Sequence, residues 1–278
     1  MSAFFLFLLI IVNILVSYKG LTNRLFFESY EFQVDRILLY KDYRRLVTSG
    51  FLHVSWLHLF FNMFSLYFFS GPVTASLGPV SFLLIYFTSL IGGNLLSLFI
   101  HRRHADYSTV GASGAVCGVM FASVALIPNM SIGIFLIPIA IPAWIYALIY
   151  ILISIYGIRS QKTNIGHDSH LGGALIGMLL ALIMHPSALI ENYGKILIIL
   201  IPTLLFIYFI TTRPQLLFVD NLFYKTHQDL NIDQRYNIRR VDQQQEVDRI
   251  LEKISKKGMN SLNKKEKETL REYSKKLR

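Results

Sequence analysis

Seven apolar stretches of the sequence are each about long enough to cross a lipid bilayer as a helix. A helix rises about 1.5 Å per residue, so about 20 apolar residues span the roughly 30 Å of hydrocarbon. The expected spans are residues 3–18, 54–70, 79–100, 112–128, 132–156, 167–185 and 195–212. Inside lipid the backbone must satisfy its own hydrogen bonds, which a helix does within one segment. The sequence therefore predicts an all-α, multi-pass membrane protein.

The composition supports a membrane protein over a soluble one. Of the 278 residues, 53% are hydrophobic and 16% are charged, so one soluble domain could not keep this much apolar surface from water. The net charge of +10 comes from basic residues in loops and in the C-terminal tail, where lipid headgroups account for them. We therefore expect the lipid bilayer as a partner, and no nucleic acid.

Two segments lie outside the apolar stretches. Residues 19–50 mix aromatic and aliphatic side chains with charges, which favours a loop in the plane of the membrane interface, with an ordinary soluble loop as the alternative. Residues 213–278 form a charged soluble tail in which two short helices are predicted. Helices this short bury little core alone, so they need to pack on a partner, on the membrane surface or on each other. The alternative is that the tail is a simple tether.

One expected span contains two polar side chains at helical spacing. His58 and Asn62 are four residues apart, so on a helix they share one face, and both can donate hydrogen bonds to the same small volume. Considered alone, such a pair is typical of hydrogen bonds between neighbouring membrane helices.

Two further spans carry a hydroxyl and an imidazole beside small residues. Ser113 lies in a Gly-x-Ser-Gly tetrapeptide, and His170 precedes a second glycine-rich stretch. The glycines at four-residue spacing are Gly114 with Gly118 and Gly173 with Gly177. Two such faces packed together place the imidazole beside the hydroxyl, as a general base requires. The alternative is a chance tetrapeptide and plain helix packing. The tetrapeptide also lacks the strand-turn-helix context of an α/β-hydrolase, which excludes that interpretation of it.

Four motifs occur in a fixed order along the chain. They are Arg45-Leu46-Val47-Thr48-Ser49-Gly50-Phe51-Leu52-His53, His58-x-x-x-Asn62, Gly111-Ala112-Ser113-Gly114, and His170 followed by Gly173-x-x-x-Gly177. Together they resemble the signatures of the rhomboid family of intramembrane serine proteases. The resemblance covers residues 1–185 and implies a six-helix catalytic core there. The last apolar stretch then predicts an additional transmembrane helix in residues 186–212.

The resemblance also implies roles for the motif residues. Ser113 is the expected nucleophile and His170 the expected general base, in a dyad without a third carboxylate. His58, Asn62 and the Ser113 backbone amide are the expected oxyanion hole. The expected structural supports are Gly111, Gly114, Gly118, Gly173, Gly177, Arg45 and His53. His53 either braces the adjoining loop or is a simple interfacial histidine.

The implied activity is that of a serine-type endopeptidase that cleaves transmembrane protein substrates in or near the bilayer. No cofactor and no metal site are expected. A catalytically silent rhomboid-like protein that binds membrane helices is the first alternative, and a small-solute transporter is the second. We place the chain in a bacterial plasma membrane. Basic residues in the loops beside the site favour a cytoplasmic site by the positive-inside rule, whereas the resemblance implies the opposite orientation.

Two positions depart from the family pattern. Arg44 stands where the family usually carries an aromatic residue. Cys117 stands four residues after the serine, where some members have a tyrosine that packs on the base. This second departure leaves His170 held less firmly or held by another group. Asp168 is a poor substitute, because two residues before His170 on a helix it points elsewhere.

Overall fold

The computed structural model describes residues 2–134, 137–160 and 166–212, together with ten separate positions of the tail. Those positions are 247, 250, 253, 254, 258, 261, 262, 266, 267 and 270. The chain divides into two compact units, Met1–Tyr224 and Lys225–Arg278. In the second unit, Lys253 Nζ lies 2.8 Å from Glu266 Oε1 in an ion pair. The two helices expected in the tail lie largely outside the described residues.

The first unit is built mainly from α-helices. They are α1 (Ser2–Thr22), α2 (Arg24–Tyr30), α3 (Val34–Leu38), α4 (Arg45–Thr48), the 3-10 helix η1 (Ser49–Phe51), α5 (Trp56–Leu77), α6 (Pro79–His101), α7 (Ser113–Leu126), α8 (Ala143–Ser160), α9 (His167–Met184) and α10 (Pro186–Thr212). Among the described residues, two short antiparallel pairs accompany them. They are β1 (Phe32–Gln33) with β2 (Ser108–Thr109), and β3 (Ser131–Ile134) with β4 (Ile137–Pro142).

Several helices are long and apolar enough to cross a membrane. Among the described residues these are Phe4–Thr22 of α1, and α6, α9 and α10, four in all. A fifth span results if Arg45–Phe51 and α5, which meet at a bend of 98°, count as one. Helices α7 and α8 are apolar but shorter. The predicted all-α class is thus confirmed, with several helices suited to cross a membrane, while the number of seven spans stays a prediction.

The expected span at 132–156 is wrong in its first part. Residues 131–142 contain the β3–β4 hairpin, and α8 begins only at Ala143. Pro138 and Pro142 explain the difference, because proline lacks the N–H that a helix interior needs and clashes with the preceding turn. The last helix differs in the other direction: α10 begins at Pro186, before the expected residue 195, and contains non-helical backbone at Asn192.

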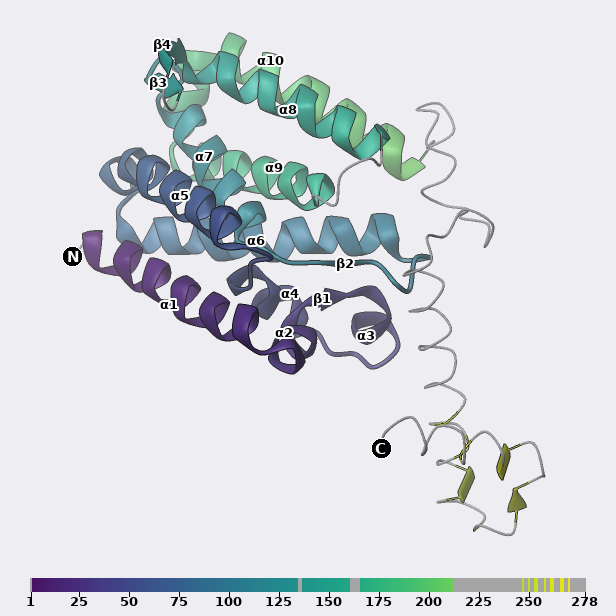
Figure 1. The fold of residues 1–278 in the computed structure, drawn as a ribbon. Coiled ribbons are helices and arrows are strands. Elements are labelled where there is room, and N and C mark those ends of the chain that lie inside the picture. Colours follow the sequence, from purple (N-terminus) through teal and green to yellow (C-terminus); the bar gives the residue numbers. More distant parts are fainter. Residues whose placement is uncertain are drawn as a thin grey trace. The chain divides into compact units, whose positions relative to one another are not determined.

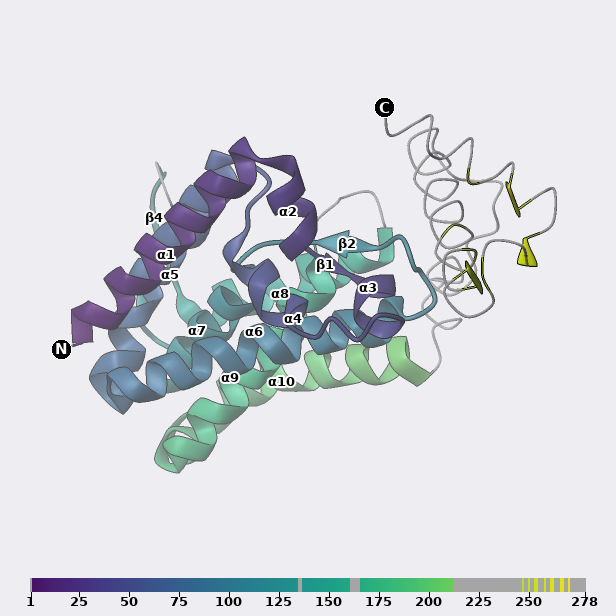
Figure 2. The same cartoon turned by 90° about the horizontal axis from the view of Figure 1, so that it is seen from below.

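Helix α7 forms the centre of the first unit. It contacts α9, α6 and α5, and its residues from Gly114 to Ala125 are all buried (Figure 1). Figure 2 shows α1 beside α5 on the outside of this group. Only 28% of the apolar window is buried in both α1 and α10, so most of their apolar surface remains for lipid. In contrast, α7 is buried by its neighbours α5, α6 and α9, which shield it from lipid.

Glycines allow α7 and α9 to approach until their backbones touch. A Cβ atom added to Gly173 would collide with the backbone of Gly114, and one added to Gly177 would collide with the backbone of Gly118. A backbone cannot yield as a flexible side chain can. The four-residue glycine spacing on both helices therefore fixes how closely they pack.

We expect Gly177→Val to lower the thermal unfolding temperature strongly, because the added side chain forces α7 and α9 apart. The expected loss is about 3 kcal/mol or more of unfolding free energy, at the upper end of overpacking effects. Thermal unfolding in detergent measures it. Gly71→Ala on α5 is the matched control, since no atom lies within 4 Å of its added Cβ. Equal unfolding temperatures for both variants would contradict the packing argument.

Candidate active site

Ser113 is the first residue of α7, and a tight turn places it there. Gly111 has φ of 136°, a left-handed conformation that favours glycine. Its amide donates to the Ser49 carbonyl at 3.0 Å. The next amide, of Ala112, donates to His53 Nε2 at 3.4 Å. Both bonds hold the turn, so the start of α7 is fixed on two sides.

The serine hydroxyl lies against an imidazole from another helix. Ser113 Oγ is 2.6 Å from Nε2 of His170, although 57 residues separate them in the sequence. His170 lies in the first turn of α9 and is 9% exposed. The glycine contact between α7 and α9 brings the two helix starts together. A hydroxyl and an imidazole in such a contact have the arrangement of a nucleophile and its base.

A third polar group touches the other side of the imidazole. Tyr150 of α8 has its hydroxyl oxygen 3.0 Å from His170 Nδ1 and 2.9 Å from Cys117 Sγ. Tyr150 was not predicted from the sequence. Its only signal was a phenol in an apolar stretch, four residues after Tyr146, and tyrosine is common in membrane helices. The departure at Cys117 left open whether another group holds His170. Tyr150 is such a group, since its hydroxyl contacts the imidazole.

The His58 imidazole and the Ser113 hydroxyl both lie beside Gly111, and Asn62 lies one turn further along α5. A Cβ atom on Gly111 would lie 3.1 Å from His58 Nε2 and 3.5 Å from Ser113 Oγ, so the imidazole edge and the hydroxyl flank the same spot. Asn62 is 6% exposed, and its amide donates to the His58 carbonyl at 2.9 Å. Within the described part of the chain, the buried His58 Nδ1 has no hydrogen-bond partner.

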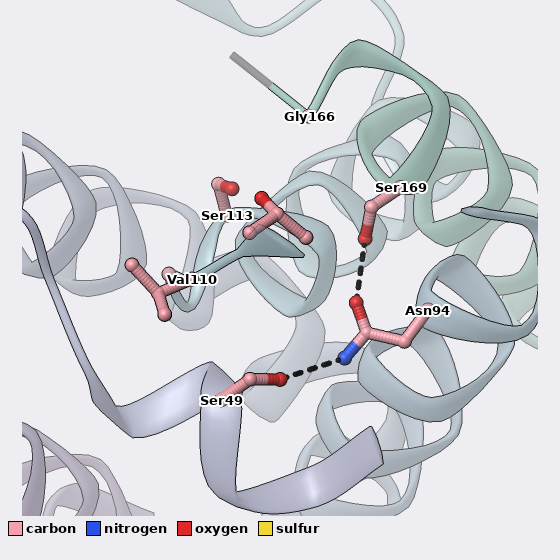
Figure 3. A pocket seen from close by; sticks show the side chains of 8 residues that line it. Ser49, Asn94, Val110, Ser113, Gly166 and Ser169 are labelled. Atoms are coloured by element: carbon pink, nitrogen blue, oxygen red, sulfur yellow. Dashed lines mark hydrogen bonds between the residues drawn. The ribbon is translucent and has the colours of Figure 1, made fainter. Parts of the chain in front are cut away.

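A small polar pocket lies beside Ser113 (Figure 3). Its lining consists of Ser49, Asn94, Thr109, Val110, Gly111, Ser113, Gly166 and Ser169. Asn94 joins three elements, because its amide donates to Ser49 Oγ at 3.3 Å and its oxygen accepts from Ser169 Oγ at 3.0 Å. The pocket has room for about one water molecule.

The two supports expected in the first loop make several contacts. Arg45 is 5% exposed; it donates to the carbonyls of Glu28 and Glu31 at 3.0 and 2.6 Å and pairs with Asp42 at 2.9 Å. The neighbouring Arg44 also pairs with Asp42, at 2.7 Å. Arg45 therefore ties three parts of this loop together.

His53 is fully buried, which argues against a simple interfacial histidine. Its Nδ1 lies 2.8 Å from the hydroxyl of Ser17 on α1, and its Nε2 accepts from Ala112. Ser17 in turn donates to the Phe51 carbonyl at 2.9 Å. The ring thus connects α1 to the turn before Ser113, which is the geometry of a brace.

Asp168 turns away from the base. Its carboxylate lies 3.4 Å from His101 Nε2 and accepts from the Tyr107 hydroxyl at 3.4 Å. The rings of His101 and Tyr107 stack at 3.6 Å. These contacts attach the start of α9 to the end of α6 and the following loop.

Comparison with known proteins agrees with this architecture. Residues 40–187 match the model of the Rhomboid domain. The chain belongs to the rhomboid family. Residues 230–276 match a second family, DUF6576, whose function is unknown.

Several named proteins are similar to this rhomboid chain. It is 31% identical over 150 residues to the mitochondrial Rhomboid protein 1 of Saccharomyces cerevisiae. This match covers 51% of this chain and 43% of the yeast protein. It is 31% identical over 150 residues to the mitochondrial RHOMBOID-like protein 12 of Arabidopsis thaliana, covering 48% and 44%. It is 36% identical over 94 residues to the putative rhomboid protease YdcA of Bacillus subtilis, covering 33% and 46%. The matches thus span less than half of each of these relatives.

One carboxyl group in the first loop has an unusual environment. Burial raises the pKa of Glu31 to about 7, against a partly opposing attraction from Arg45. The folded protein therefore keeps this proton at a pH where the unfolded chain, with a pKa of 4.5, releases it. The resulting stability is present below the unfolded pKa and is lost as the pH rises to about 7.

We expect Glu31→Gln to remove this pH dependence, because the amide stays neutral. The unfolding temperature of the variant should rise relative to wild type between about pH 5 and pH 8. Thermal unfolding in detergent across this range measures the difference. Glu191→Gln, at an exposed position of α10, is the control and should show no such trend. A constant difference between Glu31→Gln and wild type would show that the buried carboxyl does not titrate in this range.

Proposed function

We propose that this rhomboid protein is an intramembrane serine endopeptidase, which cleaves a peptide bond in or near the transmembrane helix of another membrane protein. The observation that carries the proposal is the 2.6 Å contact between Ser113 Oγ of α7 and His170 Nε2 of α9, which is partly buried. Both dyad residues are present, which argues against a silent relative. The transporter alternative has no support in a family whose motifs the chain carries in order.

The proposed reaction proceeds in two halves. Ser113 Oγ attacks the substrate carbonyl carbon while His170 Nε2 takes the hydroxyl proton. The C–N bond then breaks, His170 returns the proton to the leaving amine, and the acyl group stays on Ser113. Water attacks this ester while His170 Nε2 takes a proton from it. The bond between the acyl carbon and Ser113 Oγ then breaks, His170 returns the proton to Oγ, and the new carboxyl end is released.

The negative charge on the carbonyl oxygen requires donors in both halves. The Ser113 amide is one candidate, since the first amides of a helix have no partner within it. His58 supports the proposal because its ring flanks the same spot as the serine hydroxyl. Asn62 has a second amide hydrogen besides the one it gives to the His58 carbonyl.

The second half needs water inside a mostly apolar protein. The polar pocket lined by Ser49, Asn94 and Ser169 adjoins Ser113 and has room for about one water. Its hydroxyl and amide groups are the partners such a water needs. This pocket therefore supports a hydrolytic reaction over plain binding of a helix.

The substrate must change shape before it reacts. A transmembrane helix keeps its carbonyl groups in internal hydrogen bonds, so the segment at the cleavage site has to unwind. Small, helix-breaking residues near the cleaved bond lower this cost. We therefore propose substrates with such residues in or beside their transmembrane helices.

The proposal includes the expected division of the chain. Residues 1–185 form the six-helix catalytic core, 186–212 add a seventh span, and 213–278 are a charged soluble tail for which a partner is one candidate role and a simple tether the other. For the compartment we keep the bacterial plasma membrane as a prediction. The matched relatives include mitochondrial proteins as well as one protein from Bacillus subtilis.

Ser113→Ala should reduce cleavage of a transmembrane test substrate in liposomes by about 10⁴-fold or more, because the attacking oxygen is gone. Ser70→Ala is the matched control, since Ser70 is a buried serine of α5 that donates to the Tyr67 carbonyl of its own helix. Product formation is followed by gel and mass spectrometry. Undiminished cleavage by the Ser113→Ala protein would remove the proposed nucleophile.

A further inference from the structure

Four side chains form a continuous row of hydrogen bonds through the site. Ser113 contacts His170 at 2.6 Å, His170 contacts Tyr150 at 3.0 Å, and Tyr150 contacts Cys117 at 2.9 Å. The row begins and ends on α7, because Cys117 lies four residues after Ser113 on the same helix. Helix α9 supplies the imidazole and α8 supplies the phenol. The imidazole is therefore held from both of its nitrogens.

We propose that Tyr150 is the positioning residue of the dyad, which orients His170 and keeps its proton on Nδ1 through the phenol oxygen. This inference rests on the proposed proteolytic function. A neutral hydroxyl from α8 then orients the base of the dyad, where the sequence pattern offers no carboxylate as a third member.

The direction of the hydrogen bonds decides whether the base can work. His170 Nε2 must be unprotonated to accept the proton of Ser113, so a neutral imidazole then carries its proton on Nδ1. That N–H is part-buried and needs an acceptor. The Tyr150 oxygen supplies it at 3.0 Å.

Cys117 favours this direction over the opposite one. When the Tyr150 oxygen accepts from His170, its own hydrogen is free to be donated to Cys117 Sγ. A phenol is a stronger donor than a thiol, so the bond between them runs from oxygen to sulfur. The reverse direction would place the imidazole proton on Nε2, facing Ser113, and would leave no base.

The phenol ring is itself held in place. Phe121 of α7 meets it edge-on, with ring centroids 6.1 Å apart and planes at 64°. Tyr146, one turn earlier on α8, lies against it at 6.4 Å. The imidazole and the phenol rings are 6.2 Å apart, so Tyr150 acts on His170 through its hydroxyl and not by stacking. A fixed hydroxyl sets the orientation of the imidazole at little entropic cost.

The test is Tyr150→Phe, which removes one oxygen and leaves the ring. Tyr156→Phe is the matched control, because Tyr156 is an exposed tyrosine of the same helix. The full chain is studied in detergent with a transmembrane test substrate for kcat and KM. In parallel, nitrogen NMR of labelled histidine, assigned by comparison with His170→Gln, reports which ring nitrogen of His170 carries the proton.

We expect Tyr150→Phe to lower kcat by about 10-fold to 100-fold with KM unchanged, as for other residues that orient a reacting group without touching the substrate. The Nδ1–H form of His170 should dominate in wild type and in Tyr156→Phe, and should lose its dominance in Tyr150→Phe. Cys117→Ala should shift kcat and the protonated nitrogen in the same direction as Tyr150→Phe, and Cys117→Ser, which keeps an acceptor, should shift both by clearly less than Cys117→Ala.

Unchanged kcat and an unchanged Nδ1–H form in Tyr150→Phe would overturn the inference, as would a rise in KM alone. If Tyr150→Phe is poorly folded, the contrast between Cys117→Ala and Cys117→Ser decides in its place. Failure of the proposed function is a separate outcome. It would appear as a lack of Ser113-dependent cleavage in wild type, while the NMR signal still decides whether Tyr150 holds the proton on Nδ1.

Discussion

The backbone contact between α7 and α9 is the constraint on which the candidate site depends. Gly114 and Gly118 on one helix face Gly173 and Gly177 on the other, at a separation that leaves no room for a Cβ atom. At this separation the first turns of the two helices lie side by side, and the side chains of Ser113 and His170 meet. Larger residues would move the whole of α9, and with it the imidazole. The chemistry is thus set by packing between helices more than by any local motif.

Several polar groups around Ser113 are arranged so that they satisfy one another. Asn94 joins Ser49 to Ser169 beside the serine, and His53 joins α1 to the turn before it. Each of these contacts crosses between elements that are distant in sequence. Because an unpaired polar group in apolar surroundings is costly, such contacts specify how the helices fit together as well as stabilising them. The network also leaves a small polar pocket beside Ser113, which the proposed hydrolysis uses.

Much of this architecture could be predicted from the sequence, and the differences have physical causes. The helical membrane class follows from the apolar stretches, and the family follows from four ordered motifs. The hairpin at 131–142 was missed because its apolar residues suit a helix or a strand equally, and the prolines were given too little weight. Tyr150 was missed because only the tertiary structure brings α8 to the imidazole. The roles of Ser113, His170, His58 and Asn62 stay predictions, since contact distances describe an arrangement and not a reaction.

The most direct measurement of the central claim is the site at which a fluorophosphonate reacts with the protein. Such a probe modifies a serine that an adjacent base activates. The account predicts covalent attachment at Ser113 in the folded wild type, identified by peptide mass spectrometry, and its loss in His170→Ala or after heating. Attachment elsewhere, or equal reaction at Ser113 without His170, would contradict the claim that helix packing builds an active dyad from these two residues.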